Sequence, residues 1–188
     1  MMEKRVAIWT IGHSTLSIAE FIRTLKSFAI EIVVDVRSFP GSRRYPHFNR
    51  ENLMQSLTQA SIEYLHLPEL GGRRRARADS QNLAWRNESF RGYADYMETP
   101  DFREGIARLL DLTSARRTAI MCSEAVWWRC HRSLISDYLK AKGVEVTHIA
   151  AAEKSAPHPF TTAARIVNGK LSYRSVLETD DRLFDNSA

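Results

Sequence analysis

The segment 122–132 holds the densest group of reactive side chains, reading Cys-Ser-Glu-Ala-Val-Trp-Trp-Arg-Cys-His-Arg. An ionised Cys122 thiol can act as a nucleophile, and the Glu124 carboxylate can act as a general base. Arginine binds phosphate or carboxylate groups through paired N–H donors. We therefore take Cys122 as a candidate nucleophile or pocket wall, and expect an anion to bind beside it. The candidate binding residues of this segment are Arg129, His131 and Arg132.

Two more specific chemistries fit this segment less well. Six residues separate Cys122 from Arg129, one more than in the Cys-x5-Arg loop of cysteine phosphatases. Cys130 and His131 are neighbours on a predicted helix, where adjacent side chains point about 100° apart, which suits a shared metal ion poorly. We therefore expect no metal and no other cofactor, and interpret Cys130 as a small buried apolar residue.

Polar residues also follow the first two predicted strands. His13 comes directly after the first strand, and Asp35 and Arg37 come at the end of the second. Because ligands of parallel sheets bind outside the carboxyl ends of the strands, we expect these residues to share one cleft with Cys122. His13 and Asp35 are candidate catalytic residues, with Asp35 an alternative to Glu124 as the base. An unpaired buried carboxylate is costly, so we expect Asp35 to be held by a hydrogen bond or by an arginine such as Arg37 or Arg132.

Arginine dominates the positive charge of the chain. The net charge is +5, 21 of the 27 basic residues are arginine, and ten arginines but only five acids lie within residues 37–91. Arg43, Arg44 and Tyr45 combine guanidinium groups with an aromatic ring, as a surface that binds phosphates and stacks bases would. The run Arg73-Arg-Arg-Ala-Arg77 is either a second phosphate contact or a solvated loop.

The elements that must position these residues alternate between strand and helix. Strands are predicted at 5–12, 30–36, 62–67, 118–122 and 144–149, and helices at 18–28, 50–60, 90–97, 100–114 and 128–142. The strands are apolar on both faces, which is typical of buried parallel sheets. We therefore predict an α/β fold in three layers, with a mostly parallel sheet, helices on both faces and a small C-terminal hairpin.

The domain organisation is expected to be simple. The 188 residues fit one α/β domain over 1–150 and a C-terminal extension over 151–188, with a hairpin turned at Asn168-Gly169. The apolar stretch near the N-terminus is too short for a signal sequence or a membrane span, so we expect a cytoplasmic protein that does not bind membranes. Its two cysteines are then expected to be reduced.

Several motifs together resemble a known family. They are Thr10-Ile-Gly-His-Ser-Thr15, Asp35-Val-Arg-Ser-Phe-Pro-Gly-Ser42, Tyr45-Pro-His-Phe48, Tyr64-Leu-His-Leu-Pro-Glu-Leu-Gly-Gly72, Phe90-Arg-Gly-Tyr93, Cys122-Ser-Glu124 and Cys130-His-Arg132. In order and wording they are similar to the bacterial and archaeal family named domain of unknown function 488, over roughly residues 6–150. The resemblance implies a small cytoplasmic α/β protein and leaves the reaction open.

Two functions are consistent with these observations. The first is an enzyme that acts on a phosphate-bearing substrate, such as a nucleotide or a nucleic acid, in a cleft of arginine, cysteine and glutamate side chains. The second is a nucleic-acid binding module without catalysis, which uses the same arginine-rich and aromatic loops. Steep weakening of binding with salt would favour the second, because many phosphate contacts release many counterions.

Overall fold

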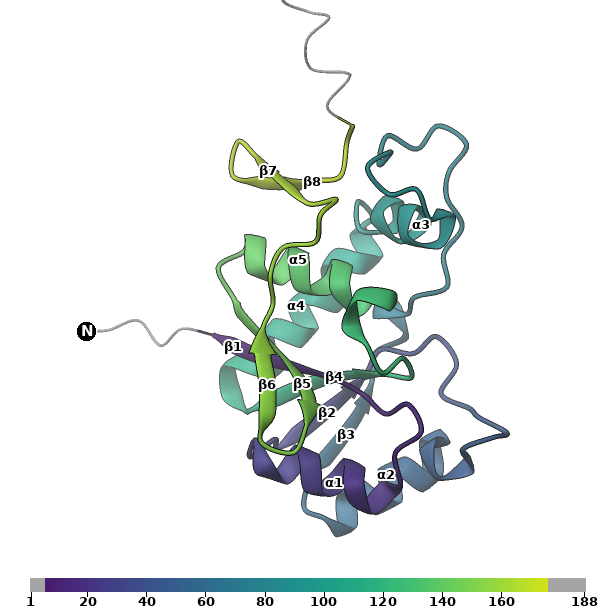
Figure 1. The fold of residues 1–188 in the computed structure, drawn as a ribbon, viewed down its shortest axis with the longest axis vertical. Helices are drawn as coiled ribbons and strands as arrows, with labels where there is room; N and C mark the ends of the chain where they lie inside the picture. The colour runs from purple at the N-terminus through teal and green to yellow at the C-terminus, as the bar shows by residue number, and fades with distance from the viewer. Residues whose placement is uncertain (1–5, 176–188) are drawn as a thin grey trace, which may run out of the picture.

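A six-stranded sheet forms the centre of the computed structural model, which describes residues 6–175 (Figure 1). The strand order is β3-β2-β4-β1-β5-β6. Five strands are parallel: β1 (Ala7–Gly12), β2 (Ile32–Asp35), β3 (Glu63–His66), β4 (Thr118–Cys122) and β5 (Glu145–Ala151). Only β6 (Lys154–Pro157) runs antiparallel, at the edge beside β5.

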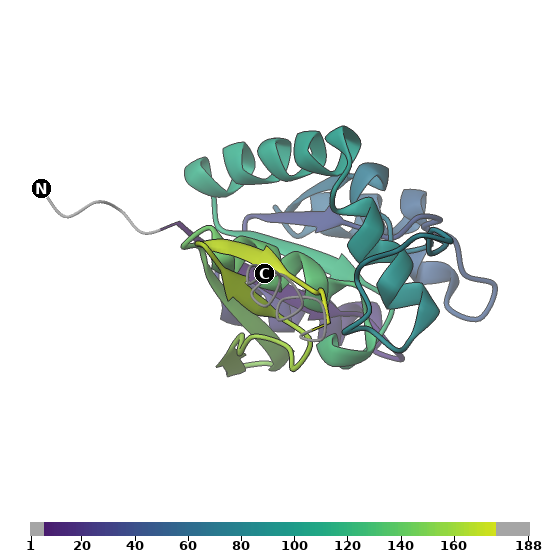
Figure 2. The same cartoon turned by 90° about the horizontal axis from the view of Figure 1, so that it is seen from above.

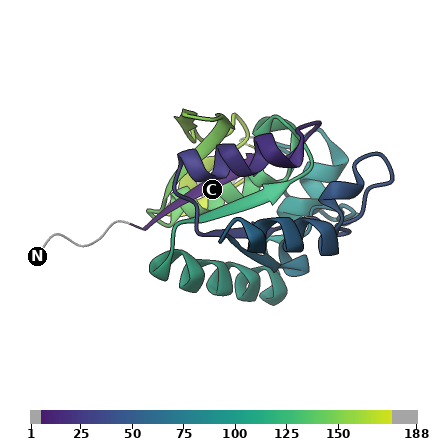
Figure 3. The ribbon, with the colours of Figure 1, turned by 90° about the horizontal axis from the view of Figure 1, so that it is seen from below.

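Helices cover both faces of this sheet. One face carries α1 (Ile18–Ser27) and α2 (Arg50–Gln59), which lie nearest the viewer in Figure 3. The other carries α3 (Glu88–Tyr96), α4 (Pro100–Ala115) and α5 (Arg132–Ala141), which lie above the sheet in Figure 1 and on the viewer's side of it in Figure 2. The predicted three-layer α/β fold is confirmed. No helix within residues 6–175 combines the length and apolar character that crossing a membrane requires.

The sequence explains why the central strands are buried on both sides. Every residue of β2 and β4 is buried, and alternate residues contribute to the core above and below the sheet. The carboxyl ends of three neighbouring strands therefore come together. Gly12 at the end of β1 pairs with Cys122 of β4, and Asp35 of β2 pairs with Met121. This edge of the sheet positions the side chains described below.

The C-terminal part contains the predicted hairpin. It consists of β7 (Arg165–Val167) and β8 (Lys170–Ser172), and its turn residues Asn168 and Gly169 have φ of 49° and 74°. Strand β6 was not predicted, because its residues are exposed and carry no apolar alternation. Tyr173 returns to the core beside α5, so the extension packs on the α/β unit. Arg5 of the first predicted strand and residues 176–188 of the extension lie outside the described residues.

The prediction of a continuous helix over 128–142 is wrong. A short 3-10 helix, η3 (Trp127–Arg129), comes first, and α5 begins only at Arg132. Between them Cys130 is extended, with φ −129° and ψ 148°. The two other 3-10 helices, η1 (Pro46–Phe48) and η2 (Pro68–Leu70), lie in the loops that follow β2 and β3.

Candidate functional site

A cavity of about 880 Å³ opens at the carboxyl ends of β1, β2 and β4. Its floor contains the end of β4 and the turn before α5, and its walls come from the loops after β1, β2 and β3. Six arginines line it, against one carboxylate, that of Glu124. The arginines are Arg37, Arg44, Arg73, Arg74, Arg75 and Arg129.

Most of these arginines have no carboxylate partner. Among residues 6–175, an ion pair is formed by Arg37 but not by the other five lining arginines. Arg73 lies over the ring of Phe39 and Arg44 over that of Tyr45, at 5.6 and 5.5 Å from the ring centroids. The cavity therefore carries an excess of positive charge that the carboxylates of residues 6–175 do not pair, which favours an anionic ligand.

Arg37 is held in place by a buried carboxylate. Its Nε and Nη2 donate to the Oδ1 and Oδ2 of Asp35 at 2.9 and 2.6 Å, and Nη2 also donates to the Phe48 carbonyl at 2.9 Å. The Tyr64 hydroxyl donates to the same carboxylate at 2.8 Å. The expected pairing of Asp35 is thus found. With its oxygens occupied, Asp35 orients Arg37 and does not line the cavity.

His13 is a neutral residue at the end of β1. Burial lowers its pKa to about 4, and the positive charge of Arg37 acts in the same direction. Its Nδ1 donates to the Ser14 carbonyl at 3.1 Å, which leaves Nε2 as the acceptor facing Arg37 Nη1 at 3.4 Å. Its ring stacks on Phe48 with centroids 4.1 Å apart. His13 therefore presents a fixed, uncharged imidazole to the cavity.

The two cysteines have opposite pKa shifts. Interaction with Cys130 and burial raise the pKa of the Cys122 thiol to about 12. Burial alone would raise the pKa of Cys130, but the Cys122 thiol and the Arg132 guanidinium outweigh it and lower that pKa to about 6. The reason is geometric: Arg132 Nε donates to Cys130 Sγ at 3.4 Å. These shifts favour Cys130 over Cys122 as the thiolate, and they favour the pocket-wall role of Cys122 over its role as nucleophile.

The sequence of this chain matches one known protein family. The family model described as Domain of unknown function DUF488 matches residues 17–139, about two thirds of the chain. This chain belongs to the DUF488 family. The resemblance inferred from the motifs is thereby confirmed. Neither the curated proteins nor the solved structures contained a match.

The start of α5 in this DUF488 chain is not a free anion site. The backbone N–H of Ser133 donates to the Cys130 carbonyl at 2.9 Å, and that of Leu134 donates to the His131 carbonyl at 3.1 Å. Arg132 is also engaged within the protein: Nη2 donates to the Glu124 carbonyl at 2.5 Å, and Nη1 to Thr10 Oγ1 at 3.4 Å. Arg132 therefore supports the loop after β4 from behind and does not reach the cavity.

The arginine-rich loop of the DUF488 chain is fixed to α3. Asp95 accepts hydrogen bonds from the Arg77 N–H at 2.8 Å and the Ser80 hydroxyl at 2.6 Å. A Cβ on Gly92 would lie 2.5 Å from the backbone of Arg75, so the loop packs directly against the glycine. No sequence pattern indicates this role of Asp95, because its hydrogen-bond partners lie 13 to 18 residues away. The run reaches the cavity through Arg73, Arg74 and Arg75.

A buried polar chain behind the cavity was also missed. Thr10 Oγ1 contacts His148 Nδ1 at 2.7 Å, His148 Nε2 contacts His158 Nδ1 at 2.8 Å, and His158 Nε2 contacts Asp137 at 3.0 Å. Asp137 also accepts from the Tyr173 hydroxyl at 2.9 Å. Its members are spread over four segments, so only the folded chain shows the network. It ties the C-terminal extension to Thr10, which contacts Arg132.

The structure thus divides the predicted site residues into two groups. Those that line the cavity are His13, Arg37, Arg44, Tyr45, Cys122, Glu124, Arg129 and His131. Those that do not are Asp35 and Arg132, which are buried supports, and Arg43, which is exposed beside the cavity.

Proposed function

We propose that the cavity binds a phosphate-bearing ligand of the nucleotide class, and that the chain acts on it as an enzyme. The observation that carries this proposal is the ratio of six arginines to one carboxylate around a cavity of about 880 Å³. That volume falls in the range of about 300–1,000 Å³ typical of small-molecule sites. Arginine forms charge-assisted hydrogen bonds with phosphate. Asp35 and the Phe48 carbonyl hold Nε and Nη2 of Arg37, so Nη1 is the donor left for a ligand.

Exposed aromatic rings favour a nucleotide over a simpler phosphate. Phe39 lines the cavity and is 72% exposed, and Trp128 beside Arg129 is 57% exposed. An exposed ring next to guanidinium groups can stack on a base while the phosphate contacts arginine. Glu124 is the candidate general base, because it is the one carboxylate among the lining residues and is exposed to the cavity.

Calorimetric titration with a nucleoside monophosphate and with the matching nucleoside tests the binding step. The monophosphate should bind and the nucleoside should bind far more weakly. Arg44→Gln should weaken binding about tenfold or more, because hydrogen bonds to charged groups contribute about 1.5–3 kcal/mol. Arg43→Gln is the matched control, because Arg43 is the sequence neighbour of Arg44 and is exposed but lies outside the cavity. Equal effects of the two substitutions would refute a specific cavity site.

The second candidate is a nucleic-acid binding module without catalysis, favoured by the exposure of Phe39 and Trp128. Salt separates the two. A mononucleotide should lose little affinity between about 50 and 200 mM salt. For a single strand with Z phosphates in contact with the protein, the logarithm of the binding constant should fall with the logarithm of the salt concentration, with a slope of about −0.7Z. Tight, steeply salt-dependent oligonucleotide binding without mononucleotide binding would favour the module.

A further inference from the structure

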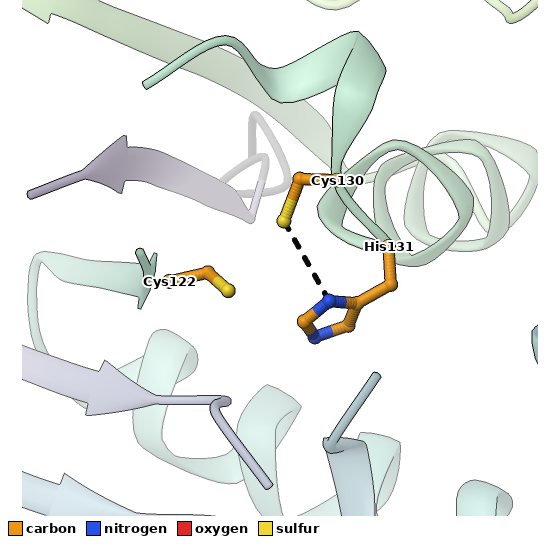
Figure 4. A group of neighbouring side chains, drawn as sticks. All are labelled: Cys122, Cys130 and His131. Atoms are coloured by element: carbon orange, nitrogen blue, oxygen red, sulfur yellow. Dashed lines mark hydrogen bonds between the residues drawn. The ribbon is translucent and has the colours of Figure 1, made fainter. Parts of the chain in front are cut away.

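Three potential metal ligands converge on the cavity floor. The sulfur atoms of Cys122 and Cys130 and a ring nitrogen of His131 lie within 4.8 Å of one another (Figure 4). Cys122 points from the end of β4 toward the other two, and Cys130 Sγ lies 3.6 Å from His131 Nδ1. Both cysteines are free thiols. Within residues 6–175 this is the one group of three or more such residues arranged to hold a metal ion.

The prediction that Cys130 and His131 lie on one helix, where neighbouring side chains diverge, is wrong. The backbone of Cys130 is instead extended and α5 starts at Arg132. Both side chains can therefore turn toward Cys122 from the same side of the chain.

The imidazole of His131 is oriented as a metal ligand. Its Nε2 donates to the Val36 carbonyl at 3.0 Å, which places the ring proton on Nε2 and leaves the Nδ1 lone pair directed to the sulfurs. Metal-binding histidines characteristically donate their other N–H to a carbonyl or carboxylate in this way. The ring also packs against Tyr93, with centroids 5.1 Å apart, and against Gly72. These contacts fix the orientation of the ring.

The ligand types and distances select the metal. Soft thiolates with imidazole favour zinc over magnesium or calcium. Zn–S bonds of about 2.3 Å imply tetrahedral ligand separations of about 3.8 Å, so ligands now within 4.8 Å need to close by about 1 Å at most. The cationic Arg132 at Cys130 Sγ stabilises the anionic sulfur that a metal requires.

We propose that Cys122, Cys130 and His131 bind one zinc ion, with its fourth coordination position open to the cavity. Three protein ligands and an open position are typical of catalytic zinc sites. All three residues line the cavity, so the open position faces the space bordered by Arg37 and Glu124. The zinc site stands on these three residues and does not depend on the phosphate-binding proposal.

Titration of the reduced, chelator-treated protein with Zn²⁺, in competition with a coloured chelator, tests this assignment. One equivalent should bind. Replacing Zn²⁺ by Co²⁺ should give the near-ultraviolet charge-transfer band of cobalt thiolates and the intense visible bands of a tetrahedral ion. Cys122→Ser, Cys130→Ser and His131→Ala should each weaken binding by more than the roughly 10–100-fold that loss of an outer-shell partner costs.

Two variants make the result specific. Ser89→Ala removes a cavity-lining hydroxyl on α3, away from the three ligands, and should leave Zn²⁺ binding unchanged. Gly72→Ala retains every ligand but would place a Cβ 2.3 Å from His131 Nδ1, so it should weaken binding by displacing the ring. Circular dichroism of the metal-free variants establishes whether they fold.

The proposal is overturned if the folded, reduced protein binds no Zn²⁺, or binds it equally well without Cys122 and Cys130. Formation of an intramolecular disulfide, with no metal affinity in the reduced state, would also overturn it and identify a redox pair instead. Nucleotide titration in the presence of chelator is independent of these outcomes, so the two proposals can fail separately.

Discussion

Replacing Arg37 by methionine would remove the central side chain of the cavity wall. Arg37 is only 6% exposed, and Asp35 is fully buried. The substitution deletes the Nε and Nη2 donors to Asp35 and the donor to the Phe48 carbonyl. The Tyr64 hydroxyl and the Arg37 backbone N–H would remain as donors to a carboxylate that has lost its counterion.

The expected loss is large because one charge stays buried without its partner. Breaking a buried ion pair by removing one member costs about 3–5 kcal/mol of unfolding free energy. For a chain of this size each kcal/mol lowers the melting temperature by about 2–4 °C, so Arg37→Met should lower it by roughly 6–20 °C. Asp35→Asn with Arg37→Met should cost less than the two single changes added together, because no buried charge remains.

Urea unfolding of the four proteins in this cycle gives the coupling free energy. We expect at least about 1.5 kcal/mol of coupling, within the roughly 0.5–3 kcal/mol seen for contacting residues. The exposed pair Arg77 and Glu98, joined at 2.8 Å, is the control and should couple by about 1 kcal/mol or less. Additive effects for Arg37 and Asp35, within about 0.5 kcal/mol, would refute the assigned pairing.

Three further predictions concern pH, thiol reactivity and backbone contact. The pKa values of His13 and His148 are lowered from 6.5 to about 4 and about 3. The unfolded chain therefore takes up these protons first, and the urea midpoint should fall as the pH drops from 6.5 toward 4. In metal-free protein, mass spectrometry after brief alkylation at pH 7 should find Cys130 modified before Cys122, because only Cys130 has a pKa lowered to about 6. Gly12→Ala would place a Cβ 1.8 Å from a backbone carbonyl, and should cost about 1–3 kcal/mol of unfolding free energy.

Each of these has a contradicting outcome. The histidine account fails if His13→Asn and His148→Gln variants show the same pH dependence of the midpoint as the parent. Faster labelling of Cys122 than of Cys130 would show that Cys122, at the end of β4, is the more reactive thiolate. Gly41→Ala is the control for Gly12, since a Cβ there meets no atom within 4 Å, and equal destabilisation of both would argue against the close contact.

The fold was predictable where the sequence pattern is local and repeated. Buried strands separated by amphipathic helices indicate the sheet, and Ser17 with Glu20 forms the capping box that starts α1. The turn at Asn168 and Gly169 follows from two residues that accept positive φ. Strand β6 has neither signal, because it is a short exposed edge strand ending in proline.

The location of the site could be predicted from the sequence, but the contacts of its side chains could not. The carboxyl ends of neighbouring parallel strands lie at the same edge of the sheet. His13, Arg37 and Cys122 therefore line one cavity. Which guanidinium points into the cavity depends on partners far away in sequence, as with Arg132 and the Thr10 hydroxyl. The extended backbone at Cys130 likewise depends on tertiary packing and not on local propensity.

Phosphate is the group that we propose the arginine-lined cavity to bind. A crystal structure of the protein grown with a nucleoside monophosphate, near the concentration that half-saturates it in solution, tests this most directly. We predict that the phosphate lies in the cavity, with oxygens in hydrogen-bonding distance of Arg37 Nη1 and of Arg44 or Arg129. A nucleotide bound elsewhere on the surface, with the cavity holding only water, would contradict the account.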